Sequence, residues 1–469
     1  MIDMKIKSFK AFILAAVVAF VSACNNDNSS LLKTEVPVRP SGQQDMIGYA
    51  DAPMDIVRIG FVGLGDRGGS AVKRYVHVPW SRTVAVCDAE TDRAENSASY
   101  LESKGFPKPA IYDGLEGYKA LCEREDIDLV YICTDWEHHV PVALYAMEHG
   151  KHVAVEVPSA NSLKECWDLV NASEKYRRHC VILENCCYDF FELLSLELHR
   201  QGAFGEVIHA EGAYHHSLDF YWDQYWNDWR LKYNASHRGD LYPTHGLGPI
   251  AQVMNINRGD VFASLVAIDT KSVNGKEFMK TKRGVENADF ANGDLTCTIL
   301  KTAKGKTLLI EHDVMTPRPY NRMYQLVGTK GYAAKYPVKQ LVLEQSVLDR
   351  LGVDYKITDA HASLPEDVIE QLHRKVNVPI LNEELEKKAK TVGGHGGMDW
   401  IMDYRLIYCL HYGLPVDMDV YDLASWCCLS ELGSLSMENG NRGVEVPDFT
   451  RGAWNKRNGF SYAFPEIED

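Results

Sequence analysis

The sequence has 469 residues, of which 45% are hydrophobic, so it is long enough for two or three domains with large cores. Its 65 acidic side chains outnumber 50 basic ones, and the formal net charge of −15 argues against a nucleic acid partner. The 12 cysteines include no C-x-x-C spacing, so neither a zinc site nor a redox motif is indicated, and we predict no metal.

Residues 1–24 are typical of a bacterial lipoprotein signal peptide. Lysines precede a short apolar run at residues 11–21, and Val21-Ser22-Ala23-Cys24 resembles a lipobox in which Cys24 becomes the lipidated first residue. A plain secretory peptide is the alternative. Residues 25–54 are polar and turn-rich, and we interpret them as a flexible tether. We therefore expect an exported lipoprotein, periplasmic or at the cell surface, that meets a membrane only through its lipid anchor.

A strand, a glycine turn and a helix follow the tether. The apolar run at residues 55–65 is rich in β-branched side chains, which favours a buried strand, and Gly63-x-Gly65-x-x-Gly68 leads into a helix. The glycines allow a tight turn and a close approach of the backbone to phosphate, and the amides at the helix N-terminus face a pyrophosphate. The pattern predicts a dinucleotide site. A glycine turn without ligand is the structural alternative.

A second strand at residues 82–88 ends in Asp88. A carboxylate at this position accepts hydrogen bonds from the ribose hydroxyls of the adenosine and repels a 2′-phosphate. The cofactor is therefore predicted to be NAD and not NADP.

The alternation of strands and helices continues to residue 185. We expect strands at 126–134, 152–158 and 180–185, and helices at 138–150 and 162–179. This order predicts an α/β fold with a parallel Rossmann sheet over residues 55–185, whose ligands bind at the carboxyl ends of the strands. One such end is followed by Trp136, His138 and His139, which could flank the nicotinamide. The alternative interpretation is structural: these residues form the N-terminus of a helix, and the histidines lie at the surface.

The layout resembles the glucose–fructose oxidoreductase and inositol dehydrogenase superfamily. That resemblance implies a C-terminal α/β domain with an open sheet, here residues 186–469, which holds the sugar. Dehydrogenases of the superfamily usually carry Glu-Lys-Pro after the fifth strand, whereas this chain has Val157 at the lysine position. A standard dehydrogenase is thereby disfavoured, since valine relays no proton.

Six motifs in order make the resemblance more specific. They are GLGxRG, the turn from Trp136 to His139, EVP, ENCCY, YPTH and the glycine–histidine loop at residues 393–399. Together they are similar to glycoside hydrolase family 109, the NAD-dependent α-N-acetylgalactosaminidases. The resemblance implies a substrate glycan that ends in an α-linked N-acetylgalactosamine.

Such an enzyme returns its cofactor unchanged, which suits an exported protein. Oxidation at C3 of the sugar makes the C2 proton acidic, a base removes that proton, the aglycone leaves C1, water adds, and C3 is reduced again. This is not the route of glycosidases that use two carboxylates, so no acid–base carboxylate pair is expected.

The resemblance also implies site residues. His245 is the first candidate for proton transfer, because imidazole titrates near neutrality. Tyr242, His395 and Tyr214 complete the catalytic candidates; His395 lies among four glycines and could close over the substrate. The substrate would contact Tyr214, Tyr242 and Tyr324. The cofactor would contact Gly63, Gly65, Asp66, Arg67, Asp88, Trp136, Glu137, His138, His139, Glu156, Val157, Asn185, Arg230, Tyr242, Pro243, Thr244 and His245.

Each of these candidates has a structural alternative, such as a surface salt bridge for Arg230 or a core position for Tyr324. Two other functions also stay open. One is an NAD-dependent sugar oxidoreductase or epimerase on the same scaffold, and the other is a sugar-binding lipoprotein with inactive cofactor machinery. The intact glycine fingerprint, Asp88 and His245 together argue against the second. The sequence leaves the oligomeric state open, a homo-oligomer included.

Overall fold

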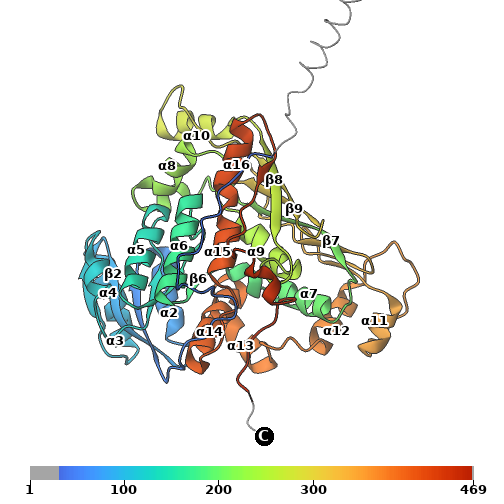
Figure 1. Ribbon diagram of the computed structural model, residues 1–469, viewed down its shortest axis with the longest axis horizontal. Coiled ribbons are helices and arrows are strands. Elements are labelled where there is room, and N and C mark those ends of the chain that lie inside the picture. Colours follow the sequence, from blue (N-terminus) through green and yellow to red (C-terminus); the bar gives the residue numbers. More distant parts are fainter. Residues whose placement is uncertain (1–30, 467–469) are drawn as a thin grey trace, which may run out of the picture.

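Two β-sheets from successive parts of the chain organise the computed structural model, which describes residues 31–466 (Figure 1). The predicted signal peptide and residues 25–30 lie outside the described residues. Within the described range, no helix combines the length and the apolar character that a membrane crossing requires.

The N-terminal sheet has six parallel strands in the order β3-β2-β1-β4-β5-β6, the order of a Rossmann fold. The prediction of a Rossmann domain is confirmed. Its elements are β1 (Val57–Val62), α2 (Asp66–Tyr75), β2 (Ser81–Asp88), α3 (Thr91–Ser103), β3 (Ala110–Asp113), α4 (Gly117–Cys122), β4 (Leu129–Ile132), α5 (Trp136–Glu148), β5 (His152–Val155), α6 (Leu163–Tyr176) and β6 (Cys180–Ile182).

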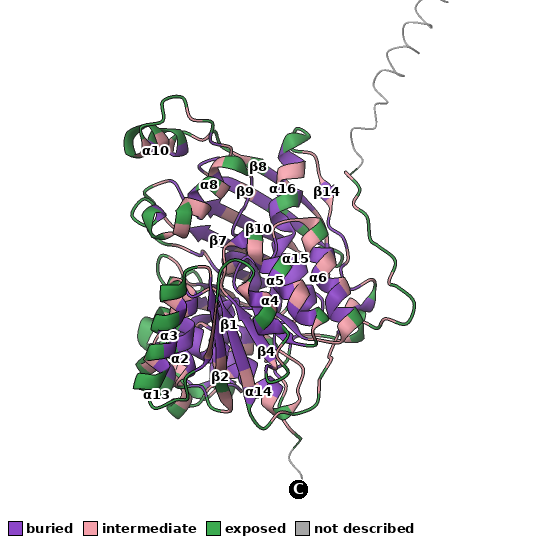
Figure 2. Cartoon of the chain, turned by 90° about the vertical axis from the view of Figure 1, so that its left-hand side faces the viewer, coloured by how far each residue is buried: buried purple, intermediate pink, exposed green. Residues whose placement is uncertain are grey.

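The apolar runs in the sequence form strands β1, β4, β5 and β6 of this sheet. Strands β4, β5 and β6 are buried along their whole length, which is the pattern of a parallel sheet covered on both faces. Figure 2 labels β4 among the strands of this sheet. Helix α5 begins two residues earlier than the sequence analysis expected. The Asp135 side chain accepts a hydrogen bond from the His138 amide at 3.1 Å, so Asp135 caps the helix before Trp136.

The C-terminal sheet has eight strands in the order β13-β12-β11-β7-β10-β9-β8-β14. Strand β7 pairs in parallel with β10, and the other neighbours are antiparallel. Its elements are η1 (Asn185–Tyr188), α7 (Phe190–Arg200), β7 (Val207–His215), η2 (Trp222–Gln224), η3 (Trp226–Asp228), α8 (Trp229–Ser236), α9 (Thr244–Val253), β8 (Phe262–Asp269), α10 (Asn274–Arg283), β9 (Thr296–Thr302), β10 (Thr307–Asp313), β11 (Gln325–Gly328), β12 (Tyr332–Ala334), β13 (Gln340–Val342), α11 (Gln345–Arg350), α12 (Glu366–Lys375), α13 (Glu383–Val392), η4 (His395–Gly397), α14 (Met398–Tyr412), α15 (Val420–Cys427), α16 (Leu429–Glu438), β14 (Val444–Glu445) and η5 (Ala453–Lys456).

Two glycines allow α9 to lie directly on β7. A Cβ atom on Gly212 would lie 2.2 Å from the carbonyl oxygen of Gly246, and one on Gly246 would lie 2.4 Å from the amide nitrogen of Ala213. Neither position accepts a side chain without a shift of the backbone. The helix that begins with the YPTH motif is therefore fixed against the central strand of the second sheet.

Helices near the C-terminus return to the Rossmann domain. Asp403 of α14 accepts hydrogen bonds from Arg74 on α2 and from the Tyr131 hydroxyl on β4, both at 2.9 Å, and α15 packs against α6. A boundary at residue 185 therefore separates the two sheets, but it does not separate all the helices that cover them.

The segment predicted as a flexible tether is attached to the body from residue 31 onward. Arg39 donates two hydrogen bonds to the buried Glu174 carboxylate, at 2.9 and 3.0 Å, and Leu32 forms a β-bridge with Val444. The Met46 amide donates to the Tyr421 hydroxyl at 2.9 Å. The tether interpretation is thus wrong for residues 31–54, because their polar side chains bind partners on the body and not only water.

Candidate active site at the junction of the two domains

A cavity of about 1070 Å³ lies where the carboxyl ends of β1, β2, β4 and β5 meet the C-terminal domain. This is the place where open parallel sheets bind ligands. Both domains contribute walls, and the size is ample for a ligand larger than a single sugar. Most of the residues predicted from the sequence line it: Gly63, Gly65, Asp66, Arg67, Asp88, Trp136, His138, His139, Glu156, Val157, Asn185, Tyr214, Arg230, Tyr242, His245 and His395.

The glycine turn between β1 and α2 fits a dinucleotide. Gly63 has φ +85°, and a Cβ atom on it would lie 2.5 Å from the backbone of Cys133, so only glycine fits there. A Cβ atom on Gly65 would meet no atom closer than 4.0 Å, so this position is open to a ligand. The turn is thus a cradle that a pyrophosphate can approach at the N-terminus of α2.

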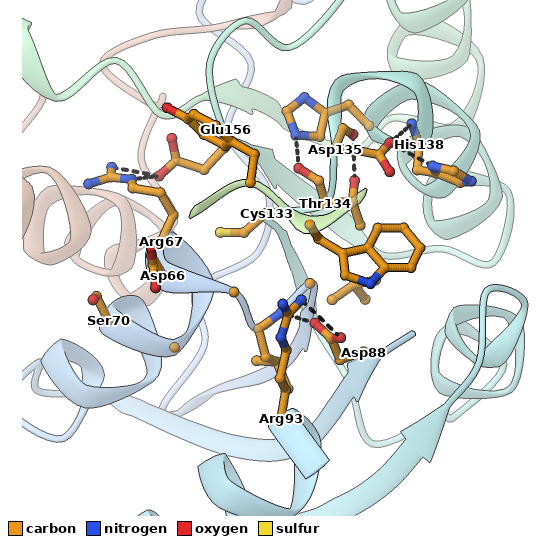
Figure 3. A pocket seen from close by; sticks show the side chains of 18 of the residues that line it. Asp66, Arg67, Ser70, Asp88, Arg93, Cys133, Thr134, Asp135, His138 and Glu156 are labelled. Carbon is orange, nitrogen blue, oxygen red and sulfur yellow. Dashed lines mark hydrogen bonds and ion pairs between the residues drawn. The ribbon is translucent and has the colours of Figure 1, made fainter. Parts of the chain in front are cut away.

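Asp88 lies at the end of β2, beside this turn (Figure 3). Its carboxylate accepts hydrogen bonds from the amides of Leu64, at 2.5 Å, and Glu90, at 2.9 Å, and lies 3.6 Å from Arg93. Each carboxylate oxygen keeps a second lone pair for a ribose hydroxyl. The residues present therefore fit the adenosine half of NAD.

Arg67 joins the cofactor cradle to the glycine–histidine loop. Its guanidinium binds Glu156 at 2.7 Å and Asp399 at 3.0 Å, and Asn185 donates to Asp399 at 2.5 Å (Figure 3 shows the Glu156 contact). His395 lies 2.9 Å from the same Asp399 carboxylate. His395 is therefore held by a contact that sequence reasoning missed, although Asp399 lies in the motif that drew attention to the loop.

The Asp399 carboxyl is ionised in this setting. Burial by itself raises its pKa, but the charge of Arg67 and the hydrogen bond with His395 outweigh burial and hold the pKa well below its ordinary value. The negative charge of Asp399 therefore offsets part of the positive charge of Arg67 beside the glycine turn.

Aromatic side chains and one arginine form the C-terminal wall. The rings of Tyr214 and Tyr242 lie 4.4 Å apart, and the Arg230 guanidinium lies 4.8 Å from the Tyr242 ring centre and donates to the Tyr225 hydroxyl at 2.6 Å. Burial raises the pKa of Tyr214 to about 12, so its hydroxyl is a neutral hydrogen-bonding group. This wall offers ring faces and donors of the kind that hold a sugar.

Two residues of this wall were not singled out from the sequence. The Nδ1 atom of His216 forms a hydrogen bond with the Tyr214 hydroxyl at 2.8 Å, and the His216 ring lies 5.1 Å from the ring of Tyr320. Burial, with the nearby charge of Arg230, lowers the pKa of His216 to about 4. His216 is therefore neutral at neutral pH.

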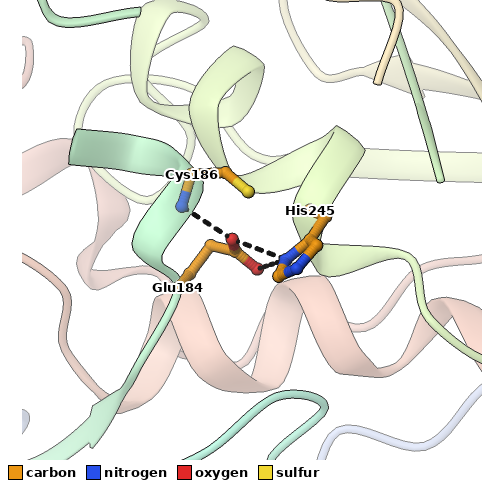
Figure 4. Close-up of side chains that lie close together, drawn as sticks. All are labelled: Glu184, Cys186 and His245. Carbon is orange, nitrogen blue, oxygen red and sulfur yellow. Dashed lines mark hydrogen bonds and ion pairs between the residues drawn. The ribbon is translucent and has the colours of Figure 1, made fainter. Parts of the chain in front are cut away.

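His245 pairs with Glu184, which the sequence analysis passed over in favour of its neighbour Asn185. The His245 Nδ1 atom lies 2.8 and 3.0 Å from the two carboxylate oxygens (Figure 4). Burial by itself raises the pKa of the Glu184 carboxyl, but the charge and hydrogen bond of His245 outweigh it and hold the pKa below its ordinary value. The sequence signals for Glu184 were its place at the carboxyl end of a strand and its position as the first residue of the ENCCY motif.

Glu184, Cys186 and His245 lie close enough together to suggest a metal site. Burial raises the pKa of the Cys186 thiol well above its ordinary value, and the Arg322 guanidinium lies 2.7 Å from the sulfur. A neutral thiol beside a cation is a poor ligand. We therefore assign no metal to this group.

Four predicted residues do not line the cavity: Glu137, Pro243, Thr244 and Tyr324. Tyr324 is buried, its hydroxyl has no hydrogen-bond partner within the described residues, and its ring lies 6.1 Å from Phe191. Tyr320, four residues earlier, lines the cavity in its place. A substrate contact by Tyr324 would require rearrangement.

Two family models together match nearly all of this fold. Residues 57–183 match "Oxidoreductase family, NAD-binding Rossmann fold", and residues 188–456 match "Glycosyl hydrolase 109, C-terminal domain". The first identifies the N-terminal unit as an NAD-binding Rossmann domain, and the second covers more than half of the chain.

Relatives match over almost their full length. The chain is 56% identical to glycosyl hydrolase family 109 protein 1 of Bacteroides thetaiotaomicron, over 93% of this chain and 94% of that protein. It is 53% identical to a glycosyl hydrolase family 109 protein of Porphyromonas gingivalis, over 93% of each. Among solved structures, levoglucosan dehydrogenase in complex with NADH and L-sorbose matches with a TM-score of 0.62 at 16% identity, over 84% of this chain and 100% of that one. This last likeness is one of fold.

Proposed function

The chain belongs to glycosyl hydrolase family 109, and on that premise we propose that it hydrolyses terminal α-N-acetylgalactosaminides with NAD as an internal redox group. One observation carries the proposal. The glycine turn and Asp88, which fit NAD, line the same cavity as His245, Tyr214 and Tyr242, and the buried Glu184 holds His245 from outside that lining.

The cofactor would lie with its pyrophosphate at the glycine turn and its adenosine ribose at Asp88. Bound NAD supplies a reversible hydride acceptor for C3 of the sugar, so that C3 is oxidised before the glycosidic bond breaks and reduced after it. The C3 carbonyl makes the C2 proton acidic; its removal expels the aglycone from C1, and water then adds to C1 while C2 regains a proton.

The side chains of the protein transfer protons and hold the sugar. His245 takes the proton of the C3 hydroxyl, because its imidazole faces the cavity and Glu184 stabilises the cation that forms. Tyr214 and Tyr242 hold the sugar ring. Val157 lines the cavity where related dehydrogenases carry lysine, so it leaves proton transfer to histidine. His395 is the second candidate for proton transfer, with Asp399 holding its Nδ1 atom.

The test is hydrolysis of an aryl α-N-acetylgalactosaminide in heavy water. We expect phenol release without net accumulation of NADH, and deuterium at C2 of the released sugar. Complete retention of the original C2 hydrogen would exclude the elimination route. Steady accumulation of NADH with an intact glycoside would instead favour a sugar oxidoreductase.

We also propose that the protein is exported and lipid-anchored at Cys24. The charged start, the apolar run and the lipobox-like Val21-Ser22-Ala23-Cys24 support this proposal. Metabolic labelling with a fatty acid tests it, since Cys24→Ser should abolish the label; label retained in that variant would contradict it.

A further inference from the structure

We infer that Glu184 is a positioning residue for His245, and that it fixes the imidazole with a proton on Nδ1 and a free lone pair on Nε2. The inference rests on the proposed function, because it states which ring nitrogen receives the proton of the sugar hydroxyl. Glu184 itself touches neither sugar nor cofactor in this scheme.

The contact geometry fixes the direction of the hydrogen bond. Both Glu184 oxygens lie within 3.0 Å of His245 Nδ1, and an ionised carboxylate only accepts, so Nδ1 must donate. The Nε2 atom has no protein partner within residues 31–466, and His245 lines the cavity. The neutral ring therefore presents its basic nitrogen to the ligand.

The carboxylate has little freedom to move. Its side chain is 0% exposed, and its Oε1 atom also accepts a hydrogen bond from the Cys186 amide at 3.1 Å. A Cβ atom on Gly248 of α9 would lie 2.9 Å from the Glu184 Cγ atom, so helix and side chain are in close contact. A group packed in this way holds its partner in one orientation.

The same carboxylate favours the positive ring that forms on proton uptake. Its charge is shielded from water, so its attraction for an imidazolium is stronger than at the surface. The other titratable or charged groups around the pair come from several elements: Tyr214 and His216 at the end of β7, Tyr242 before α9, Cys186 and Cys187 in η1, Cys427 in α15, and Arg322 beyond Cys186. Glu184 is the only carboxylate within ion-pair distance of His245 among the described residues.

The kinetic test compares Glu184→Gln with Glu174→Gln. Glu174 is also a buried carboxylate, but it binds Arg39 and Arg451 away from the cavity. We expect Glu184→Gln to lower the rate of cofactor reduction in a single turnover by at least about 10–100-fold, the range known for partners that orient metal-ligating histidines. The acidic limb of the pH–rate profile should move to lower pH, because the imidazolium has lost its stabilising charge, and Glu184→Asp should restore part of the rate. Glu174→Gln should leave the limb in place.

A second measurement needs no turnover and leaves Glu184 unchanged. In the NAD-loaded wild-type protein, 15N NMR of the His245 ring should show the neutral tautomer with its proton on Nδ1, assigned by the loss of the signal in His245→Asn. A proton on Nε2, or an unmoved acidic limb in a folded Glu184→Gln protein, would overturn the inference. A wild-type protein that shows the Nδ1 tautomer but cleaves no α-N-acetylgalactosaminide would instead refute the proposed function.

Discussion

Trp226 of the C-terminal domain donates its indole N–H to the Glu90 carboxylate of the Rossmann domain at 3.0 Å. Glu90 lies two residues beyond Asp88, so the bond spans the adenosine end of the cavity. The strap, which we define as residues 218–228, also contributes Tyr221, Gln224 and Tyr225 to the cavity wall. Arg283 also holds the strap, through ion pairs with Asp223 at 2.5 Å and with Asp228 at 3.2 Å.

The strap should slow the release of NAD. Trp226→Phe keeps the ring but removes the N–H, and one hydrogen bond is worth about 0.5–1.5 kcal/mol, so we expect dissociation about 2–10-fold faster. Stopped-flow displacement of the bound nucleotide measures this rate. Phe220→Ala is the control, since Phe220 is on the same strap but points to solvent, with 89% exposure. Equal rates in both variants would show that the Trp226–Glu90 hydrogen bond does not slow the release of NAD.

Asp88 should decide between the two nicotinamide cofactors. Nucleotide released by denaturing the wild-type protein should be NAD(H). In Asp88→Asn the repulsion of a 2′-phosphate is gone and one acceptor for the backbone amides remains, so we expect the preference for NAD over NADP to fall by about 10–100-fold. Titration of both cofactors by fluorescence gives the ratio. Recovery of mainly NADP from the wild-type protein would contradict this assignment.

His245→Ala should lower the rate of turnover by at least about 100-fold, the lower end of the range for general acid–base catalysis. The NAD should remain bound. It should also lower the melting temperature, because the buried Glu184 charge loses its partner. The double variant His245→Ala/Glu184→Gln should regain much of the melting temperature but none of the activity. A single variant that still reduces its cofactor at the wild-type rate would remove His245 from its role.

Asp240 should make the protein less stable as pH rises. Its side chain is 1% exposed, its Oδ2 atom has no hydrogen-bond partner within the described residues, and burial raises its pKa to about 7. The unfolded chain releases this proton near pH ~4, so the folded state is favoured most below that value and loses this advantage up to the folded pKa.

Asp240→Asn should therefore raise the melting temperature at about pH 8 and have a much smaller effect at about pH 5. Thermal unfolding at both pH values measures the difference. Asp359→Asn, at an exposed site, should change neither value. A larger gain at the lower pH would show that Asp240 is not the group responsible.

Local sequence signals predicted the N-terminal half of the site well. The strand before Gly63, the spaced glycines and Asp88 all lie within 34 residues of one another. Their roles follow from the local strand–turn–helix geometry, so they could be predicted without knowledge of tertiary contacts. Residues 89–125 were left unassigned, although they form α3, β3 and α4, because their apolar runs are short.

The pairs that complete the site were not predictable from spacing. Glu184 and His245 are 61 positions apart, and Arg67 and Asp399 are 332 apart, so only the packing of α9 and α14 brings each pair together. The attachment of Arg39 to Glu174 was missed for the same reason, since a polar segment has the same composition whether it binds water or a buried carboxylate. Tyr320 and Tyr324 show that a motif can mark the correct segment and still leave the inward-facing residue undecided.

The contact between Gly212 and Gly246 bears on how this enzyme can change over evolution. Tyr214 and His245 stand on two elements whose backbones touch, so any larger residue at either glycine would displace both side chains together. Substitutions at His216, at Tyr320 or in the strap are therefore the easier route to a new substrate preference, because these residues border the cavity and take no part in the contact between the two glycines. The chemistry would be inherited nearly unchanged, and the choice of glycan would diversify around it.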